Sequence, residues 1–282
     1  LSPKVIDQLV DNPSMLKLGG EKKEITAFFS DVQGFSTISE SLTPEELVEL
    51  LNEYLTAMTD IVMKYDGTVD KFEGDAVIAF FGAPIAYPDH ATRACLASLE
   101  MQAKLEQMRE NWREQGKHEL FVRIGLNTGD CVVGNMGSAY RMDYTMMGDT
   151  VNLAARLEGV NKQYKTFCMI SEFTYHSVKE DIETRELDLI RVVGKNRPVK
   201  IFEVLGKKGE VDPEKLKAFK YFTKGLQFYR RQNWDEAKKY FAHTNKLLGY
   251  DGASQIFFNR CKEFKKNPPG ADWDGVYQMT SK

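Results

Sequence analysis

The order of the periodic segments constrains the fold of this 282-residue chain more than any single residue does. A compact apolar run at 24–31 ends in a carboxylate and predicts a buried strand. A capping box at Thr43 predicts the start of a helix, and 67–72 with 75–81 predict a hairpin turning at Glu73-Gly74. Further along we expect a helix at 90–112, a hairpin of 120–128 with 131–136 turning at Gly129-Asp130, a loop at 137–148, a helix at 149–161, and strands near 167–170, 187–192 and 199–205.

This order predicts an α+β fold, a ferredoxin-like sandwich with its helices on one face of a mostly antiparallel sheet. Three parts are expected: a lead-in helix and linker at 1–22, a large domain at 23–206, and a small C-terminal helical extension at 207–282. In that tail, 213–248 predicts two helices broken at Asn233, similar to a single tetratricopeptide-like pair. One such pair cannot bury its own apolar face. We therefore expect it to dock on the large domain or on a partner, with a loop after Pro268.

Composition and charge narrow the class of protein. The formal net charge of −3 argues against a nucleic-acid binder with a basic surface. The four cysteines form no C-x-x-C pair, so neither a disulfide framework nor a zinc site is indicated. No run approaches the roughly 18 apolar residues of a membrane span. We expect a cytoplasmic location, either free or as the cytoplasmic part of a membrane-anchored receptor, with an upstream sensor or anchor preceding Leu1.

Two carboxylates stand at positions suited to metal binding. Asp31 ends the first predicted strand, and Asp75 begins the strand after the turn at Glu73-Gly74. Side chains at strand ends beside tight turns can converge, and two converging carboxylates would repel each other unless they hold cations. The alternative, favoured for either residue alone, is a carboxylate that caps its own turn.

Backbone and side-chain groups nearby suit a phosphorylated ligand. After Asp31, a Gly-containing turn through Val32, Gln33, Gly34 and Phe35 into a helix offers backbone N–H groups as a phosphate cradle. If Asp149 caps the later helix, Asn152 and Arg156 project from one face, four residues apart. An amide and a guanidinium placed so suit a ribose oxygen and a phosphate. The alternative is a solvated polar face.

Four motifs taken together resemble the class III adenylyl/guanylyl cyclase catalytic domain over roughly residues 23–205: FFSDVQGFS, VDKFEGDAVIAFFG, VRIGLNTGDCVVGNMGS and MDYTMMGDTVNLAARLE. The resemblance implies that Asp31, Asp75 and the Val32 carbonyl bind two Mg²⁺ or Mn²⁺ ions. It also implies substrate contacts by Lys71 and Thr145 to the purine, Asn152 to the ribose, and Arg156 and Arg123 to phosphate. The resemblance further implies a head-to-tail homodimer, because the metal carboxylates and the Asn/Arg helix of one site come from different subunits.

The purine preference and one departure from the family pattern also follow from this resemblance. Lys71 can only donate a hydrogen bond, whereas Thr145 can donate or accept. The family's guanylyl enzymes typically carry an acid and a Cys there, so ATP is the expected substrate, cyclised to cyclic AMP with loss of diphosphate. The family's phosphate-contacting Lys before Gly194 is replaced by Val193. Either Lys195 substitutes for it, or phosphate binding relies more on Arg123.

Other functions remain open at this level. A guanylate cyclase differs only in the purine it accepts. A GGDEF-type diguanylate cyclase is disfavoured, since Phe72-Glu73-Gly74-Asp75 replaces its signature turn. A degenerate domain that only dimerises would be expected to have lost some of the four key residues, and all of them are present: Asp31, Asp75, Asn152 and Arg156.

Overall fold

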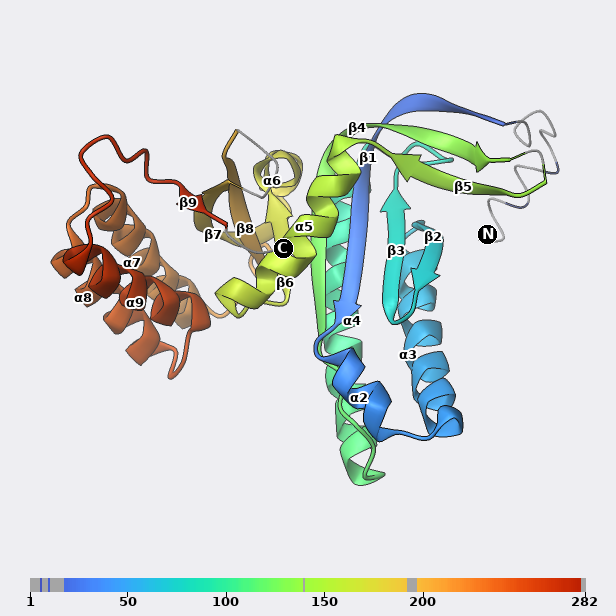
Figure 1. The fold of residues 1–282 in the computed structure, drawn as a ribbon, viewed down its shortest axis with the longest axis horizontal. Coiled ribbons are helices and arrows are strands. Elements are labelled where there is room, and N and C mark those ends of the chain that lie inside the picture. Colours follow the sequence, from blue (N-terminus) through green and yellow to red (C-terminus); the bar gives the residue numbers. More distant parts are fainter. Residues whose placement is uncertain (1–5, 7–9, 11–17, 139, 192–196, 280–282) are drawn as a thin grey trace.

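The computed structural model describes residues 6, 10, 18–138, 140–191 and 197–279. These residues form one mixed sheet in the order β2-β3-β1-β4-β6-β8-β7-β9, with β5 paired to β4 (Figure 1). The strands are β1 (Gly19–Val32), β2 (Thr68–Glu73), β3 (Ala76–Phe81), β4 (Val122–Gly137), β5 (Met142–Met147), β6 (Cys168–Ser171), β7 (Ile182–Arg191), β8 (Val199–Lys207) and β9 (Tyr277–Gln278). The helices are α2 (Phe35–Ser41), α3 (Pro44–Lys64), α4 (His90–Glu114), α5 (Asp149–Tyr164), α6 (Glu172–Val178), α7 (Pro213–Arg230), α8 (Trp234–Leu247) and α9 (Gly252–Lys266).

Helices cover both faces of the sheet, so the prediction of helices on one face only is wrong. Side chains alternate along β1: Phe28 packs in the cluster formed with α3 and α4, whereas Ala27 packs in the cluster that contains Ala154 of α5. A Cβ on Gly125 would lie 2.2 Å from the backbone N of Glu158. Glycine therefore lets α5 approach the backbone of β4 on the second face.

Several local predictions are confirmed. The side chain and backbone of Thr43 form a capping box with Glu46 at the start of α3. The first hairpin joins β2 to β3 through a turn in which Gly74 has φ 64°, a conformation that glycine adopts at little cost. The turn is formed by Gly74 and Asp75, one residue later than predicted, so Asp75 lies in the turn and not at the start of β3.

The second predicted hairpin is wrong. Strand β4 runs without a break through Gly129, whose nearly extended backbone (φ 159°) pairs with Ile25 of β1. The chain reverses later, and the far half of β4 pairs with β5, a strand inside the segment expected to be a loop. Thr145 therefore lies on a strand, in register with Gly134.

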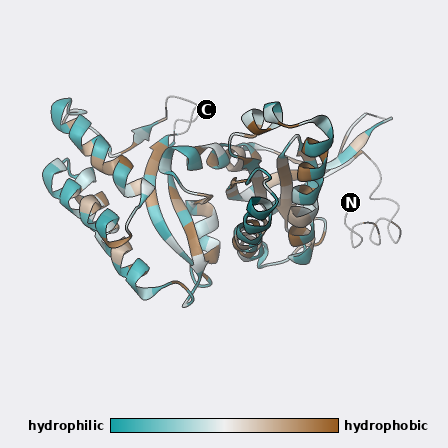
Figure 2. Ribbon diagram, turned by 90° about the horizontal axis from the view of Figure 1, so that it is seen from below, coloured by the Kyte–Doolittle hydropathy of each residue, from teal (hydrophilic) through white to brown (hydrophobic). Residues whose placement is uncertain are grey.

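The tail docks on the large domain, which is one of the two expected alternatives; the other was docking on a partner. Its first two helices, α7 and α8, agree with prediction, but α9 was not predicted. One apolar cluster joins the two parts; its members include Tyr164, Met169, Leu187, Ile201, Phe222, Phe241 and Phe257. Figure 2 shows hydrophobic residues concentrated on the strands and hydrophilic ones over much of the outer helix surface. The docked helices therefore share a core with the sheet.

Buried polar groups also cross this junction. Arg260 of α9 donates to Asp188 of β7 at 2.7 Å, and the hydroxyl of Tyr164, at the end of α5, donates to the same carboxylate at 2.6 Å. The other oxygen of Asp188 accepts from the backbone N–H of Leu189 at 2.8 Å. We call Tyr164, Asp188 and Arg260 the seam triad. It connects the tail to the helix that carries Asn152.

The remaining sequence expectations concern the ends of the chain, the cysteines and membrane spans. The lead-in helix falls almost entirely outside the described residues, whereas 19–22 belong to β1. All four cysteines are buried free thiols. Within the described ranges, no helix is long and apolar enough to cross a membrane.

Candidate active site

The carboxyl groups of Asp31 and Asp75 meet at one edge of the sheet. Asp31 lies near the end of β1, and Asp75 lies in the turn between β2 and β3. The backbone N–H of Val32 donates to Asp75 Oδ2 at 2.9 Å, and Asp75 lies close enough to Asp31 to raise the pKa of its carboxyl group. We call these two residues the carboxylate pair. Neither side chain is turned away to cap a separate turn.

The environment of the pair is short of positive charge. Arg123 of β4 donates to Asp31 at 3.2 Å and to Glu158 of α5 at 2.8 Å. Arg123 therefore contacts two of the three carboxylates gathered here, and the four groups together carry a formal charge of −2 if all of them ionise. Burial, followed by the contact with Asp75, raises the pKa of Asp31 to about 7. Glu158 was missed by sequence reasoning, although it lies two residues after Arg156 in the same motif.

The chemistry of the pair fits a divalent cation. Within the described part of the chain, no group of three or more His, Cys, Asp or Glu side chains forms a potential metal site. Two carboxylates suffice for Mg²⁺, which keeps several waters and takes further oxygens from substrate phosphates. A bound dication would remove the charge deficit that raises the pKa of Asp31.

The predicted phosphate cradle is only partly available. The backbone N–H of Gln33 donates to the Phe121 carbonyl at 2.7 Å, so it is already used within the fold. Gly34 adopts the left-handed conformation (φ 71°) and precedes α2, which begins at Phe35. The turn thus has the expected shape, but Gln33 does not contribute its amide.

Lys71 and Thr145, predicted to read the purine, lie beside a shared neighbour. Asp70 of β2 accepts from the Thr145 hydroxyl at 2.5 Å, and its other oxygen lies 3.6 Å from Lys71 Nζ. Burial raises the pKa of the Asp70 carboxyl, an effect that the contacts with Thr145 and Lys71 oppose. Asp70 was not singled out in the sequence; its position next to Lys71 was the only signal.

Helix α5 carries Asn152 and Arg156 as predicted, although the cap differs. Gly148 is the N-cap residue without a side-chain hydrogen bond, and Asp149 is the first helical residue. Asn152 is exposed, whereas Nη1 of Arg156 is buried without a hydrogen-bond partner. An unpaired buried guanidinium nitrogen is costly, and a phosphate oxygen would satisfy it.

The start of α5 lies far from the carboxylate pair of the same chain. Thr150 is held by hydrogen bonds with Asn127 and Asp130 of β4, four to seven residues along the strand from Arg123, which pairs with Asp31. At about 3.3 Å per residue this is roughly 13–23 Å. Arg156 is two helical positions from Glu158, about 200° around the axis. Since Glu158 faces Arg123, Arg156 faces away from it.

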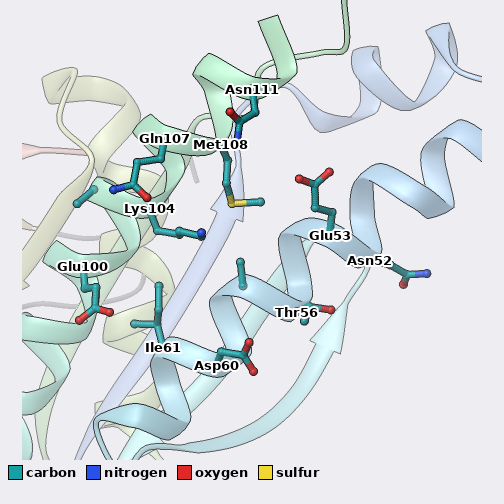
Figure 3. A pocket seen from close by; sticks show the side chains of 12 residues that line it. Asn52, Glu53, Thr56, Asp60, Ile61, Glu100, Lys104, Gln107, Met108 and Asn111 are labelled. Atoms are coloured by element: carbon teal, nitrogen blue, oxygen red, sulfur yellow. The ribbon is translucent and has the colours of Figure 1, made fainter. Parts of the chain in front are cut away.

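Two further regions complete the survey of the predicted site. Lys195 and Val193 lie outside the described residues. A groove of about 730 Å³ lies between α3 and α4 and is lined by Glu53, Asp60, Lys104 and Met108 among others (Figure 3). None of its lining residues belongs to the predicted site.

Comparison with known proteins identifies the fold and the motifs together. Residues 19–206 match the sequence model of the adenylate and guanylate cyclase catalytic domain. The chain belongs to this cyclase family. Adenylate cyclase 1 of Rhizobium meliloti (strain 1021) is 40% identical over 185 residues, which cover 66% of this chain and 28% of that protein. This cyclase chain therefore spans little more than a quarter of that relative's length.

Solved structures agree. The adenylyl cyclase CyaB from P. aeruginosa has a TM-score of 0.63 and 40% identity, covering 69% of this chain and 100% of that chain. The guanylyl cyclase Cya2 has a TM-score of 0.62 and 36% identity, covering 68% and 97%. The α+β fold class is thereby confirmed as that of the cyclase family, which uses divalent metal ions.

Proposed function

We propose that this cyclase converts ATP into 3′,5′-cyclic AMP and diphosphate, a second-messenger reaction that depends on divalent metal. The observation that carries the proposal is the contact between Asp31 and Asp75 in surroundings short of positive charge. Such a pair has no structural benefit in the fold by itself, because like charges at close range repel. Its use is to hold two Mg²⁺ or Mn²⁺ ions under a triphosphate, with the Val32 carbonyl as a further ligand.

The residues of the chain divide the work of an in-line displacement at the α-phosphorus. Asn152 orients the ribose so that its 3′-hydroxyl faces the phosphorus, and Arg156 donates to the α-phosphate as charge develops there. Arg123 lies next to the carboxylate pair, where it can exchange a carboxylate partner for phosphate. When bound, the divalent ions lower the pKa of the attacking hydroxyl and stabilise charge on the diphosphate.

The active site requires two copies of the chain. The start of α5 is anchored too far along β4 for Asn152 to reach the carboxylate pair of its own chain. In a head-to-tail homodimer, the pair of one subunit faces α5 of the other, and two equivalent sites result. In this arrangement 23–206 is the catalytic domain and 207–282 a helical tail.

ATP is favoured over GTP by Lys71 and Thr145. The ammonium of Lys71 donates to an acceptor such as N1 of adenine, and Thr145 provides an oxygen near the N6 amine. Guanine presents an acceptor and donors at the corresponding positions. The similarity to the guanylyl cyclase Cya2 makes GTP the substrate to compare.

The test is cyclic nucleotide formation by the purified chain with Mn²⁺ and either ATP or GTP. We expect cyclic AMP from the wild-type protein and none from Asp75→Ala. Cyclic GMP formed from GTP in excess of cyclic AMP would favour guanylate cyclase activity, and absence of both products would leave only a dimerisation module.

Mixing two inactive variants tests the shared site. Asp75→Ala and Arg156→Ala remove groups that belong to opposite subunits of one site. Random re-association of equal amounts should form heterodimers with one intact site, restoring about a quarter of wild-type activity. Each variant mixed with itself is the control. If the mixture stays as inactive as its components, the shared-site proposal is wrong.

A further inference from the structure

Asp70 is a buried acid beside the predicted purine site, and no role has yet been given to it. Its side chain is only 2% exposed. It occupies a bulge in β2, where the register with β3 shifts between Val69 and Lys71. A bulge re-aims a side chain relative to the strand, and Asp70 here points to Thr145 of β5.

The contacts of Asp70 differ between its two oxygens. Oδ2 accepts the Thr145 hydroxyl at 2.5 Å. Oδ1 is buried without a hydrogen-bond partner, and Lys71 Nζ lies 3.6 Å from it. The ammonium is therefore close enough to balance the charge of Asp70. Since the Lys71 ammonium makes no hydrogen bond to Oδ1, it remains able to donate to a ligand.

The hydrogen bond from Thr145 has a consequence for recognition. A threonine hydroxyl has one proton to donate and two lone pairs, whereas an ionised carboxylate can only accept. With its proton directed to Asp70, Thr145 can offer a ligand only lone pairs. It can then accept from the N6 amine of adenine, but it cannot donate to the O6 carbonyl that guanine has at the equivalent position.

We propose that Asp70 is a positioning residue that fixes Thr145 as a hydrogen-bond acceptor and so sets the preference for adenine over guanine. The inference rests on the proposed cyclase function and on the predicted role of Thr145. It resolves the ambiguity of a hydroxyl that could otherwise serve either purine. Asp70 acts through Thr145 and contacts no purine atom itself.

The decisive variant is Asp70→Asn, because asparagine keeps the size of the side chain but can donate from its amide. An amide that donates to Thr145 releases the hydroxyl proton, which can then point to guanine O6. We expect the ratio of kcat/KM for ATP to that for GTP to fall about tenfold, the usual effect of one mispaired buried group. Equilibrium binding of ATP and GTP in the presence of Mn²⁺ should change by a similar ratio.

A double-variant cycle separates this role from a structural one. Thr145→Val removes the hydroxyl and should lower the ATP preference about as much as Asp70→Asn does. Adding Asp70→Asn to Thr145→Val should then change the ratio no further. Thr145→Ser keeps a hydroxyl and should retain most of the preference. A general loss of folding would lower turnover of both nucleotides and leave their ratio unchanged.

The outcomes can be distinguished. An unchanged ratio in Asp70→Asn, or effects that multiply independently in the double variant, would overturn the role of Asp70. If Asp70→Asn does not fold, Thr145→Val alone decides, since an unchanged ratio there removes the basis of the inference. If the wild-type protein binds nucleotides but cyclises neither, the proposed function fails, whereas the binding ratios still judge Asp70.

Discussion

Two groups of carboxylates, a half-buried one at the candidate active site and a buried one at the junction with the tail, are paired in different ways. In the seam triad, both oxygens of Asp188 have donors, and Arg260 supplies one positive charge for one negative charge. At the active site, Arg123 contacts Asp31 and Glu158, and among the described residues no ion pair accompanies Asp75.

The difference separates a structural use of buried charge from a catalytic one. A buried ion pair whose hydrogen bonds are all made costs little to keep but much to break. At the active site, burial and neighbouring carboxylates raise the pKa values of Asp31 and Glu158, and a dication would offset the excess negative charge. The two groups therefore differ in charge balance as well as in burial, since Asp188 is fully buried and Asp31 is half-buried.

The largest effect is expected from Asp75→Asn. Removing one metal carboxylate should lower cyclase activity about a thousandfold, since several kcal/mol of transition-state stabilisation depend on the metal. Without metal, the fold should be as stable as the wild type or more stable, because a like-charge contact is lost. Activity with Mn²⁺ and thermal unfolding in EDTA measure the two quantities. A variant that is both active and destabilised would contradict the comparison.

The seam triad should respond in the opposite way. Arg260→Met leaves Asp188 buried without its counter-charge, and we expect the free energy of unfolding to fall by about 3–5 kcal/mol. Urea unfolding measures the change. The double variant Arg260→Met with Asp188→Leu removes both charges and should recover most of the loss. If the single variant is as stable as the wild type, the triad is not a matched ion pair.

A smaller loss is expected from Tyr164→Phe. The substitution removes only the hydroxyl that donates to Asp188, while Arg260 stays in place. The free energy of unfolding should fall by about 1–2 kcal/mol, again by urea unfolding. A loss as large as that of Arg260→Met would mean that the hydroxyl, rather than the charge pair, holds the seam together.

The smallest effect concerns pH and the metal-free protein. Asp31 has its pKa raised from 3.8 to about 7 in the folded state, so the folded protein holds a proton that the unfolded chain has lost between these values. Stability should therefore decrease as pH rises from about 4 to 7. The slope is shallow because 39% of the Asp31 side chain is exposed. Thermal unfolding in EDTA should show a flatter profile for Asp31→Asn; an identical profile would refute the shift.

Local chemistry made much of the site predictable from the sequence. The capping box at Thr43 and the turn at Gly74 depend on neighbouring residues only; the cap was located correctly and the turn to within one residue. The hairpin in turn placed Asp75 beside Asp31. Helix caps and turns, whose conformation depends on residues nearby in the sequence, could thus be predicted from the sequence.

Features that depend on distant partners could not be read in this way. Gly129 was taken as a turn, yet pairing with Ile25 of β1 keeps it extended. Residues 142–147 form β5 only because they pair with the far half of β4, and this segment was expected to be a loop. Arg260 pairs with Asp188, 72 residues away, and no pattern of neighbouring residues predicts an ion pair over that separation. The start of helix α9 has a local cause, because the side chain of its N-cap residue Asp251 accepts a hydrogen bond from the backbone N–H of Ser254.

The shared apolar cluster has a practical consequence for where the chain can be cut. The match to the cyclase catalytic-domain model ends at residue 206, but Leu187 and Ile201 pack with Phe222 and Phe257 beyond that point. A fragment that ends at residue 206 would expose the apolar side chains that the tail helices cover, and it would tend to self-associate. The end of the matched catalytic domain is therefore not a place where the chain can be cut without exposing apolar surface.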